Sequence, residues 1–253
     1  MEVQSQNNQN KNRFGQWLKT SITARMLMVG FLTLILLIPL AFIESLITER
    51  SFRQNDVVEE INDKWGNDVI VYGPILKLPY KHYTEIKTLN EKTDTYIKEI
   101  KTSIKYAYIF PETLNTVCDV DSKTLNRGNF ESAVYTTQMQ FSGKFTKPQL
   151  SSRDIKDEDI VWEKASILVR TSNLKGIKNE VDFKVGNQSY AFETNYIDNN
   201  RYLDELESSY LKESDVPKDI DINFSFNMAF NGSKLIQLIP IGKTTTMQMT
   251  SNW

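Results

Sequence analysis

The segment Met26-Leu-Met-Val-Gly-Phe-Leu-Thr-Leu-Ile-Leu-Leu-Ile-Pro-Leu-Ala-Phe-Ile43 lies close to the N-terminus and contains no charged residue. As a helix that rises about 1.5 Å per residue it reaches about 27 Å, close to the roughly 30 Å hydrocarbon core of a bilayer. No other segment of the chain is comparably apolar. We therefore predict a transmembrane helix over residues 26–47; membrane helices tolerate the Gly30 and Pro39 that it contains.

Two alternatives compete with this interpretation. A basic segment precedes the apolar run, as in a cleavable signal peptide, but the run exceeds the usual length of about 7–15 residues. No pair of small residues suited to cleavage follows at Leu40–Ile47. The second alternative is the core helix of a soluble protein, for which so long an uncharged run is unusual. The sequence favours an uncleaved membrane anchor.

The charges on the two sides of the run predict its orientation. The basic residues of the N-terminal tail are Lys11, Arg13, Lys19 and Arg25. The tail has a single acid, Glu2, whereas acids outnumber bases over residues 44–60. By the positive-inside rule, residues 1–25 form a cytoplasmic tail and the chain beyond residue 47 lies outside. These four basic residues are the site residues that the sequence assigns, and their role is to set the membrane orientation.

The composition beyond the anchor is that of a folded domain. The chain has 253 residues, of which 40% are hydrophobic and 25% charged, and its formal net charge is −2. The absence of a basic excess argues against nucleic acid as a partner. The only cysteine, Cys118, has no second cysteine to pair with, so an internal disulfide scaffold is excluded. We interpret Cys118 as a buried and unreactive thiol.

The pattern of apolar residues changes after residue 66. Residues 48–66 predict an amphipathic helical linker that ends at Gly66, a typical helix stop. Strict alternation then appears, most clearly in Thr137–Phe145 and Phe224–Phe230. We predict that residues 67–253 form a mainly β extracytoplasmic domain, an antiparallel sandwich or layered sheet.

Three local predictions break this β pattern. The polar residues 85–95 indicate a hairpin loop, and Asn231-Gly232 is a strong turn signal. Leu203 and Leu206, within residues 201–209, suggest a short helix.

The sequence lacks a recognisable reactive cluster. His82 is the only histidine, which excludes a zinc site of the usual His and Cys type. No Gly-x-Ser-x-Gly elbow, phosphate-binding loop or dinucleotide fingerprint occurs. Acidic groups that suit calcium or acid–base chemistry are Asp119/Asp121, Asp157–Asp159 and Asp219/Asp221, and we interpret them as solvated loop and strand-end residues. We therefore predict no catalytic, cofactor-binding or metal-binding residue, and no enzyme.

Several short motifs follow one another in a characteristic order. They are Val71-Tyr-Gly-Pro-Ile-Leu-Lys-Leu-Pro-Tyr80, Phe110-Pro-Glu-Thr-Leu114, Arg127-Gly-Asn-Phe130 with Val134-Tyr135, Pro240-Ile-Gly-Lys-Thr-Thr245 and Met249-Thr-Ser-Asn-Trp253. In this order the chain resembles the CreD family of inner-membrane proteins, which are labelled as proteins of cell envelope integrity. The resemblance implies a bacterial inner membrane, a large periplasmic domain and a link to envelope stress and colicin tolerance. It implies no catalytic residue, because the family has no assigned reaction.

The chain departs from the family pattern at its end. Family members continue after the external domain into a bundle of further membrane helices, whereas this chain stops at Trp253. It is either a fragment or a shortened gene product. The expected partners are the lipid bilayer, other envelope proteins and that C-terminal bundle.

Three functional hypotheses result. The favoured one is an anchored extracytoplasmic domain that serves cell envelope integrity by binding or structural contact. The second is an envelope stress sensor that signals through its transmembrane helix. The least favoured is a hydrolase of envelope material.

Overall fold

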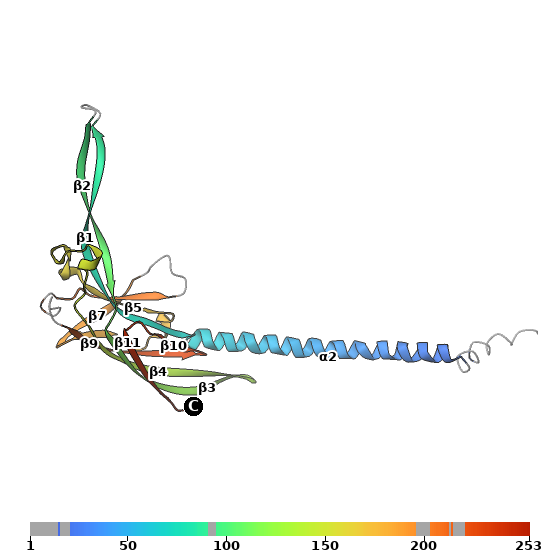
Figure 1. Ribbon diagram of the computed structural model, residues 1–253. Helices are drawn as coiled ribbons and strands as arrows, with labels where there is room; N and C mark the ends of the chain where they lie inside the picture. The colour runs from blue at the N-terminus through green and yellow to red at the C-terminus, as the bar shows by residue number, and fades with distance from the viewer. Residues whose placement is uncertain (1–14, 16–20, 91–94, 196–202, 213, 215–220) are drawn as a thin grey trace, which may run out of the picture. The chain divides into compact units, whose positions relative to one another are not determined.

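The computed structural model describes residues 15, 21–90, 95–195, 203–212, 214 and 221–253 (Figure 1). The chain divides into two compact units, residues 1–57 and 58–253. The first unit contains most of one long helix, and the second contains the end of that helix and a large β-sheet.

The long helix, α2, spans Ile22–Trp65 and continues through Pro39. The Ser21 hydroxyl caps its start by accepting a hydrogen bond of 3.3 Å from the backbone N–H of Ala24. Among the described residues, α2 is the helix that is long and apolar enough to cross a membrane, and none of its apolar window is buried in protein. The prediction of a long apolar helix is confirmed, and the exposure of its apolar residues disfavours the core-helix alternative.

The helix ends where the sequence predicts. The backbone N–H of Gly66 donates a hydrogen bond of 2.8 Å to the Asn62 carbonyl. Gly66 has a φ of 146°, which residues other than glycine rarely adopt. A Cβ atom at this position would also collide with the backbone carbonyl of Asn231. Gly66 therefore both terminates the helix and allows a close approach of strand β9.

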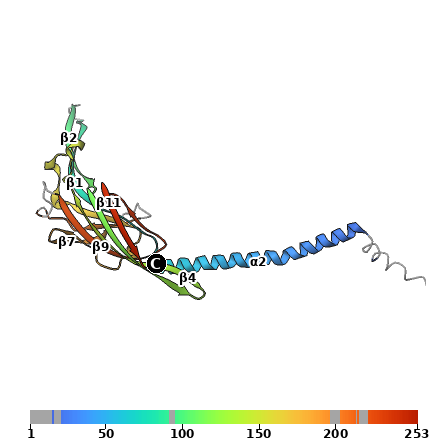
Figure 2. The same cartoon turned by 60° about the horizontal axis from the view of Figure 1, so that its bottom comes forward.

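The strands of the second unit are β1 (Val69–Asn90), β2 (Thr95–Ile109), β3 (Thr113–Arg127), β4 (Phe130–Phe145), β5 (Ser166–Thr171), β6 (Asp182–Val185), β7 (Gln188–Asn195), β8 (Asp204–Ser208), β9 (Ile222–Ser233), β10 (Ile236–Ile239) and β11 (Thr244–Ser251). Short 3-10 turns lie at Ser151–Arg153, Asp157–Asp159, Trp162–Lys164 and Leu174–Gly176. Figure 2 shows these strands from a second direction. The prediction of a mainly β domain is confirmed.

Hydrogen bonding joins the strands in the order β10-β1-β5-β8-β7-β6-β9-β4-β3-β11, and β2 pairs with β1 beside this path. Neighbours are antiparallel except β10 beside β1 and β11 beside β3, which are parallel. The two parallel pairs place the last segments of the chain at the two ends of the sheet order.

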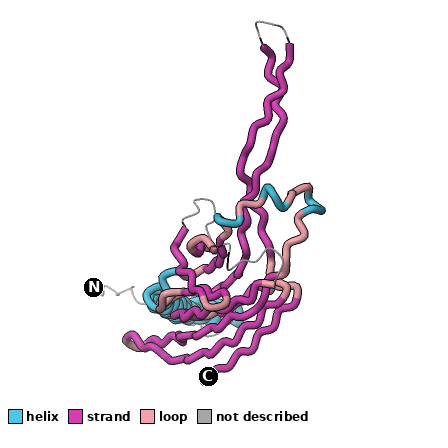
Figure 3. The backbone as a smooth tube through the Cα atoms, turned by 90° about the vertical axis from the view of Figure 1, so that its left-hand side faces the viewer, coloured by secondary structure: helices cyan, strands magenta, loops and turns pink. Residues whose placement is uncertain are grey.

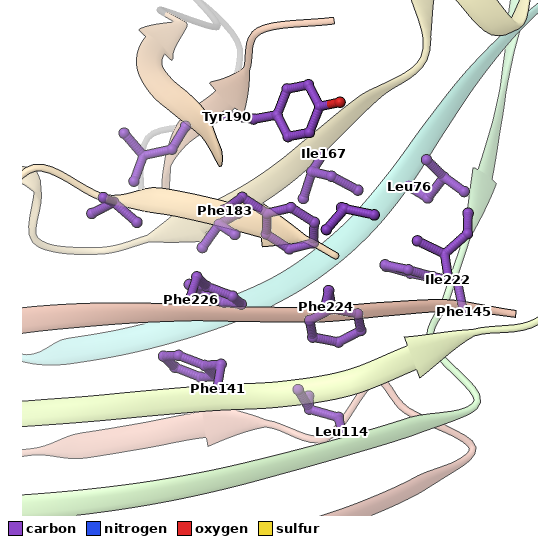
Figure 4. Close-up of a cluster of buried hydrophobic side chains, with 14 of the residues drawn as sticks. Leu76, Leu114, Phe141, Phe145, Ile167, Phe183, Tyr190, Ile222, Phe224 and Phe226 are labelled. Atoms are coloured by element: carbon purple, nitrogen blue, oxygen red, sulfur yellow. The ribbon is translucent and has the colours of Figure 1, made fainter. Parts of the chain in front are cut away.

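Aromatic side chains of the neighbouring strands β4, β9 and β6 fill much of the core. Phe141 of β4 stacks on Phe226 of β9 with ring centroids 4.4 Å apart, and Phe183 of β6 lies 5.4 Å from Phe224. Leu76 and Ile167 approach this cluster from β1 and β5 (Figure 4). The alternation predicted for β4 and β9 is confirmed, because their core-facing residues are buried.

Strands β1 and β2 form a hairpin that extends beyond the rest of the sheet (Figure 3). Their pairing runs from Leu76 opposite Ile109 to Asn90 opposite Thr95. The prediction of a loop over residues 85–95 is therefore wrong for residues 85–90 and for Thr95, which are strand, and residues 91–94 lie outside the described residues. Where the structure describes the side chains, at residues 85–88, both faces of the hairpin are exposed, so a polar sequence there does not require a turn.

Two other local predictions are also wrong. Residues 204–208, inside the suggested helix, form β8, because β5 and β7 pair with it on both sides. Asn231 and Gly232 belong to β9, and Lys234, with a φ of 63°, follows the strand. Glycine is needed at 232 because a Cβ atom there would lie 2.5 Å from the Tyr135 ring.

Candidate functional site

The residues predicted to set membrane orientation are only partly described. Lys11, Arg13 and Lys19 lie outside the described residues. Arg25 lies in the first turn of α2, with its side chain exposed and its backbone N–H donating 3.3 Å to the Ser21 carbonyl. The orientation that these residues predict stays a prediction.

The two candidate nucleophile or ligand residues lie far from each other in the sheet. Cys118 of β3 is fully buried, its Sγ lies 3.0 Å from Thr137 Oγ1, and burial raises the pKa of its thiol. His82 lies on the β1–β2 hairpin opposite Ser103. A buried thiol with a raised pKa is a poor nucleophile. This agrees with the interpretation of Cys118 from the sequence as a buried and unreactive thiol.

The acidic pairs are engaged by neighbouring side chains. The Thr250 hydroxyl donates a hydrogen bond to Asp119, and Asn252 Nδ2 donates a hydrogen bond of 2.6 Å to Asp121 Oδ1. These two carboxylates of β3 therefore bind residues of β11 and the residue that follows it. Asp221 accepts 2.9 Å from Lys144, whereas Asp219 lies outside the described residues. Within the described part of the chain, no three His, Cys, Asp or Glu residues gather as a metal site would require.

The most elaborate polar arrangement of the second unit lies where the last two turns of α2 meet strands β3 and β4. We call it the junction and define it by Glu60, Asn62, Trp65, Arg127, Ser132 and Tyr135. Trp65 Nε1 donates a hydrogen bond of 3.0 Å to the backbone carbonyl of Tyr135, and the Lys123 ammonium lies 4.0 Å from the centre of a Trp65 ring. The indole is thus held by a hydrogen bond at its edge and a cation on its face.

A second contact lies one turn earlier in the helix. Asn62 is 1% exposed, and its Oδ1 accepts 2.9 Å from Ser132 Oγ. Ile61 beside it is also buried. A buried side-chain hydrogen bond of this kind fixes the rotation of the helix end relative to β4, because a loss of either partner leaves a polar atom unsatisfied.

Charge pairing completes the junction at its exposed rim. Glu60 forms ion pairs with Arg127, near the β3–β4 turn, and with Lys64 at 2.8 Å. The hydrogen bond from Arg127, followed by that from Lys64, lowers the pKa of Glu60 to about 2. Glu60 therefore stays ionised throughout the physiological range.

On its other side the junction reaches the connection between β9 and β10. The Tyr135 hydroxyl donates 2.6 Å to the Leu235 carbonyl, and burial raises the pKa of this hydroxyl. Beside Tyr135 lies a hollow of about 400 Å³ whose lining includes Val58, Asn62, Val134 and Trp253. The arrangement can hold and orient a helix, and it presents no reactive group.

Sequence reasoning did not assign a role to any junction residue. Arg127 and Tyr135 do lie in two of the ordered motifs, Arg127–Phe130 and Val134–Tyr135. The signal was therefore present, but its meaning needed the contact between Trp65 and Tyr135, which are 70 positions apart.

Comparison with known proteins extends over nearly the whole chain. The family model described as Inner membrane protein CreD matches residues 21–253. The Inner membrane protein CreD of Escherichia coli strain K12 is 24% identical over 241 residues, which make up 93% of this chain and 50% of that protein. The chain thus spans about half the length of this curated relative. No solved structure matches the chain.

Proposed function

The chain belongs to the CreD family of inner membrane proteins, and from this premise we propose that it is an anchored module whose β unit serves the cell envelope by binding or structural contact. In this proposal α2 crosses the inner membrane with the N-terminus in the cytoplasm, and the β unit lies in the periplasm. Arg25 and the three basic residues before it support the orientation through the positive-inside rule.

One observation carries the proposal: the last two turns of α2 are built into the β unit. Trp65, Asn62 and Glu60 each bind a different residue of β3 or β4. A flexible linker would suit a domain that diffuses on a tether, whereas this attachment suits a domain that must be held in position. Two of the candidate carboxylates, Asp121 and Asp221, take part in a hydrogen bond and an ion pair within the fold, which supports a contact role over a chemical one.

The proposal is tested in cells that lack their own copy of the gene. Uptake of a hydrophobic dye and survival in detergent are measured with the full chain restored. We expect the chain to lower dye uptake, and Trp65→Ala to lose this effect at equal membrane abundance. Glu59→Ala, an exposed change on the same helix, should retain it. No difference between cells with and without the chain would refute the proposal.

A second experiment tests the proposal that the protein acts by contact and not as an enzyme. The double variant Asp119→Asn with Asp121→Asn keeps the hydrogen-bonding shape of both side chains but removes their charge. We expect it to protect the envelope as well as the original chain. A loss of protection at unchanged abundance and stability would favour the hydrolase hypothesis instead.

The unbroken helix from Ile22 to Trp65 favours a sensor as the second candidate function, since one element joins the two units. Glu49→Pro would break the helix beyond its apolar segment, whereas Glu49→Ala would not. If the protein signals through α2, only the proline variant abolishes an envelope stress response that depends on the chain. An equal response in both variants would remove this candidate.

A further inference from the structure

The β1–β2 hairpin exposes large apolar side chains along one face. Tyr96, Ile100, Ile104, Tyr106 and Tyr108 are all on β2, and the first two are 70% and 68% exposed. Alternate residues of a strand point to the same side, so these even-numbered positions share one face. The register adds Tyr83 of β1, which lies opposite Thr102. We call this set the tyrosine–isoleucine face.

Among the described residues, contacts with the rest of the unit reach the inner half of the hairpin, as far as Tyr83. Tyr83 donates a hydrogen bond of 2.9 Å to Asp159, Lys77 forms an ion pair of 2.8 Å with Glu207, and Tyr80 forms a β-bridge with Ile160. Among the described strands, β2 pairs with β1 alone. A two-stranded ribbon is marginally stable by itself, and an exposed apolar face of this kind is typical of an interaction surface.

Lysines accompany this face. Lys87 lies directly opposite Lys98 in the register, on the same side as Ile100 and Tyr96, and Lys81 lies opposite Ile104. Like charges that face each other across a strand pair are destabilising. Glu85 reduces the repulsion between Lys87 and Lys98 only slightly, because its ion pair with Lys98 is 3.5 Å long and both side chains are more than 60% exposed. A bound anion beside Lys87 and Lys98 would relieve it further.

The described part of the hairpin is basic in a chain whose formal net charge is −2. Its charged residues beyond Tyr80 are Lys81, Lys87, Lys98, Lys101 and Lys105 with Glu85 and Glu99. The surface that best complements this hairpin is therefore anionic.

We propose that the tyrosine–isoleucine face binds the surface of a bilayer that contains anionic phospholipid. Isoleucine side chains enter the boundary between headgroups and acyl chains, while the hydroxyl of the exposed Tyr96 and the lysine ammonium groups reach the phosphates. A protein partner fits less well, since lysine is depleted from protein–protein interfaces. The inference deepens the proposed function, on which it rests, by naming the ligand of one surface.

The test uses the full chain in nanodiscs of phosphatidylcholine, with or without phosphatidylglycerol, and adds vesicles of the same lipid. An environment-sensitive fluorophore is attached to Ile100→Cys. Ser103→Cys on the opposite face is the matched control. We expect a blue shift for the label at position 100 with phosphatidylglycerol, little shift with phosphatidylcholine, and reversal in high salt. The label at position 103 should shift much less.

Charge variants separate this face from a general effect of net charge. Lys87→Gln with Lys98→Gln should weaken vesicle flotation on the order of tenfold or more, since each lysine near an anionic surface adds about 1 kcal/mol. Lys101→Gln with Lys105→Gln makes the same change in net charge on the other face and should retain most binding.

Three results would overturn the proposal. They are the absence of a shift in every lipid, equal loss in both double variants, and a shift in lipid-free detergent that grows with protein concentration. The last result would show that a second copy of the chain covers the face. Because the readout is lipid binding, it can fail while the chain still protects the envelope, and protection can fail while lipid binding remains.

Discussion

Gly232 is a residue whose small size is required by one tertiary contact. An added Cβ atom would lie 2.5 Å from the hydroxyl and ring carbons of Tyr135. That hydroxyl donates 2.6 Å to the Leu235 carbonyl, so the ring has little freedom to move. We expect Gly232→Ala to lower the free energy of unfolding by about 1–3 kcal/mol, as overpacking does.

The measurement is denaturant unfolding of the full chain in mild detergent, followed by tryptophan fluorescence. Gly128→Asn is the control, because nothing lies within 4 Å of a Cβ atom there and asparagine tolerates its φ of 62°. Equal stability of Gly232→Ala and the original chain would contradict the packing argument.

Cys118 gives a second prediction at the residue scale. Burial raises the pKa of its thiol, so the reactive thiolate is disfavoured in the folded state. We expect iodoacetamide at pH 8 to leave Cys118 unmodified in the folded protein and to alkylate it fully in denaturant. Mass spectrometry gives the extent of alkylation. Rapid alkylation of the folded chain would contradict the burial of Cys118.

The end of α2 gives a pH-dependent prediction at the scale of one element. The folded-state pKa of Glu60 is lowered to about 2, below its ordinary value of 4.5. A lowered carboxyl pKa stabilises the fold above the ordinary value, and this contribution is lost as the pH falls toward the folded-state pKa. The last turns of α2 should therefore loosen between about pH 4.5 and pH 2.

Hydrogen exchange of residues 58–65, corrected for the intrinsic pH dependence, measures this loosening. Arg127→Gln removes the main cause of the lowered pKa and should shift the loosening to higher pH. Lys243→Gln is the matched control, since its ion pair with Glu112 lies elsewhere. An identical acid response in Arg127→Gln would show that this ion pair does not hold the helix end.

Elements with a local signal were the predictable ones. An uninterrupted apolar run that ends before Gly66 specifies α2, and an apolar residue at every second position specifies β4 and β9. Residues 85–88 lack such a signal, since neither face of the hairpin is buried there. Residues 204–208 form a strand because β5 and β7 enclose Leu206, which is a tertiary effect.

The junction was beyond sequence reasoning for a related reason. Asn62 and Ser132 are 70 positions apart, and neither residue type in isolation indicates a partner. The basic residues that are predicted to set orientation needed no tertiary contact, because the positive-inside rule depends on local charge alone. Sequence thus gave a hypothesis for how the chain enters the membrane, and structure added how the helix attaches to the sheet.

At the scale of the whole molecule, the orientation of the chain decides which compartment the β unit meets. In the proposed arrangement residues 1–25 are cytoplasmic and the β unit is periplasmic. Two single-cysteine positions report on the two sides: Ser5→Cys in the tail, and Ser151→Cys, an exposed residue of the 3-10 turn Ser151–Arg153. Buried Cys118 serves as the internal standard that reacts only after denaturation.

We expect a maleimide that cannot cross the inner membrane to label Ser151→Cys in intact cells, and to label Ser5→Cys only after the membrane is opened. Reversal of the tail charges, with Lys19→Glu and Arg25→Glu, should weaken this preference because it removes part of the positive flank. Labelling of position 5 in intact cells, with position 151 protected, would invert the topology. The β unit would then face the cytoplasm, and a periplasmic contact role would be untenable.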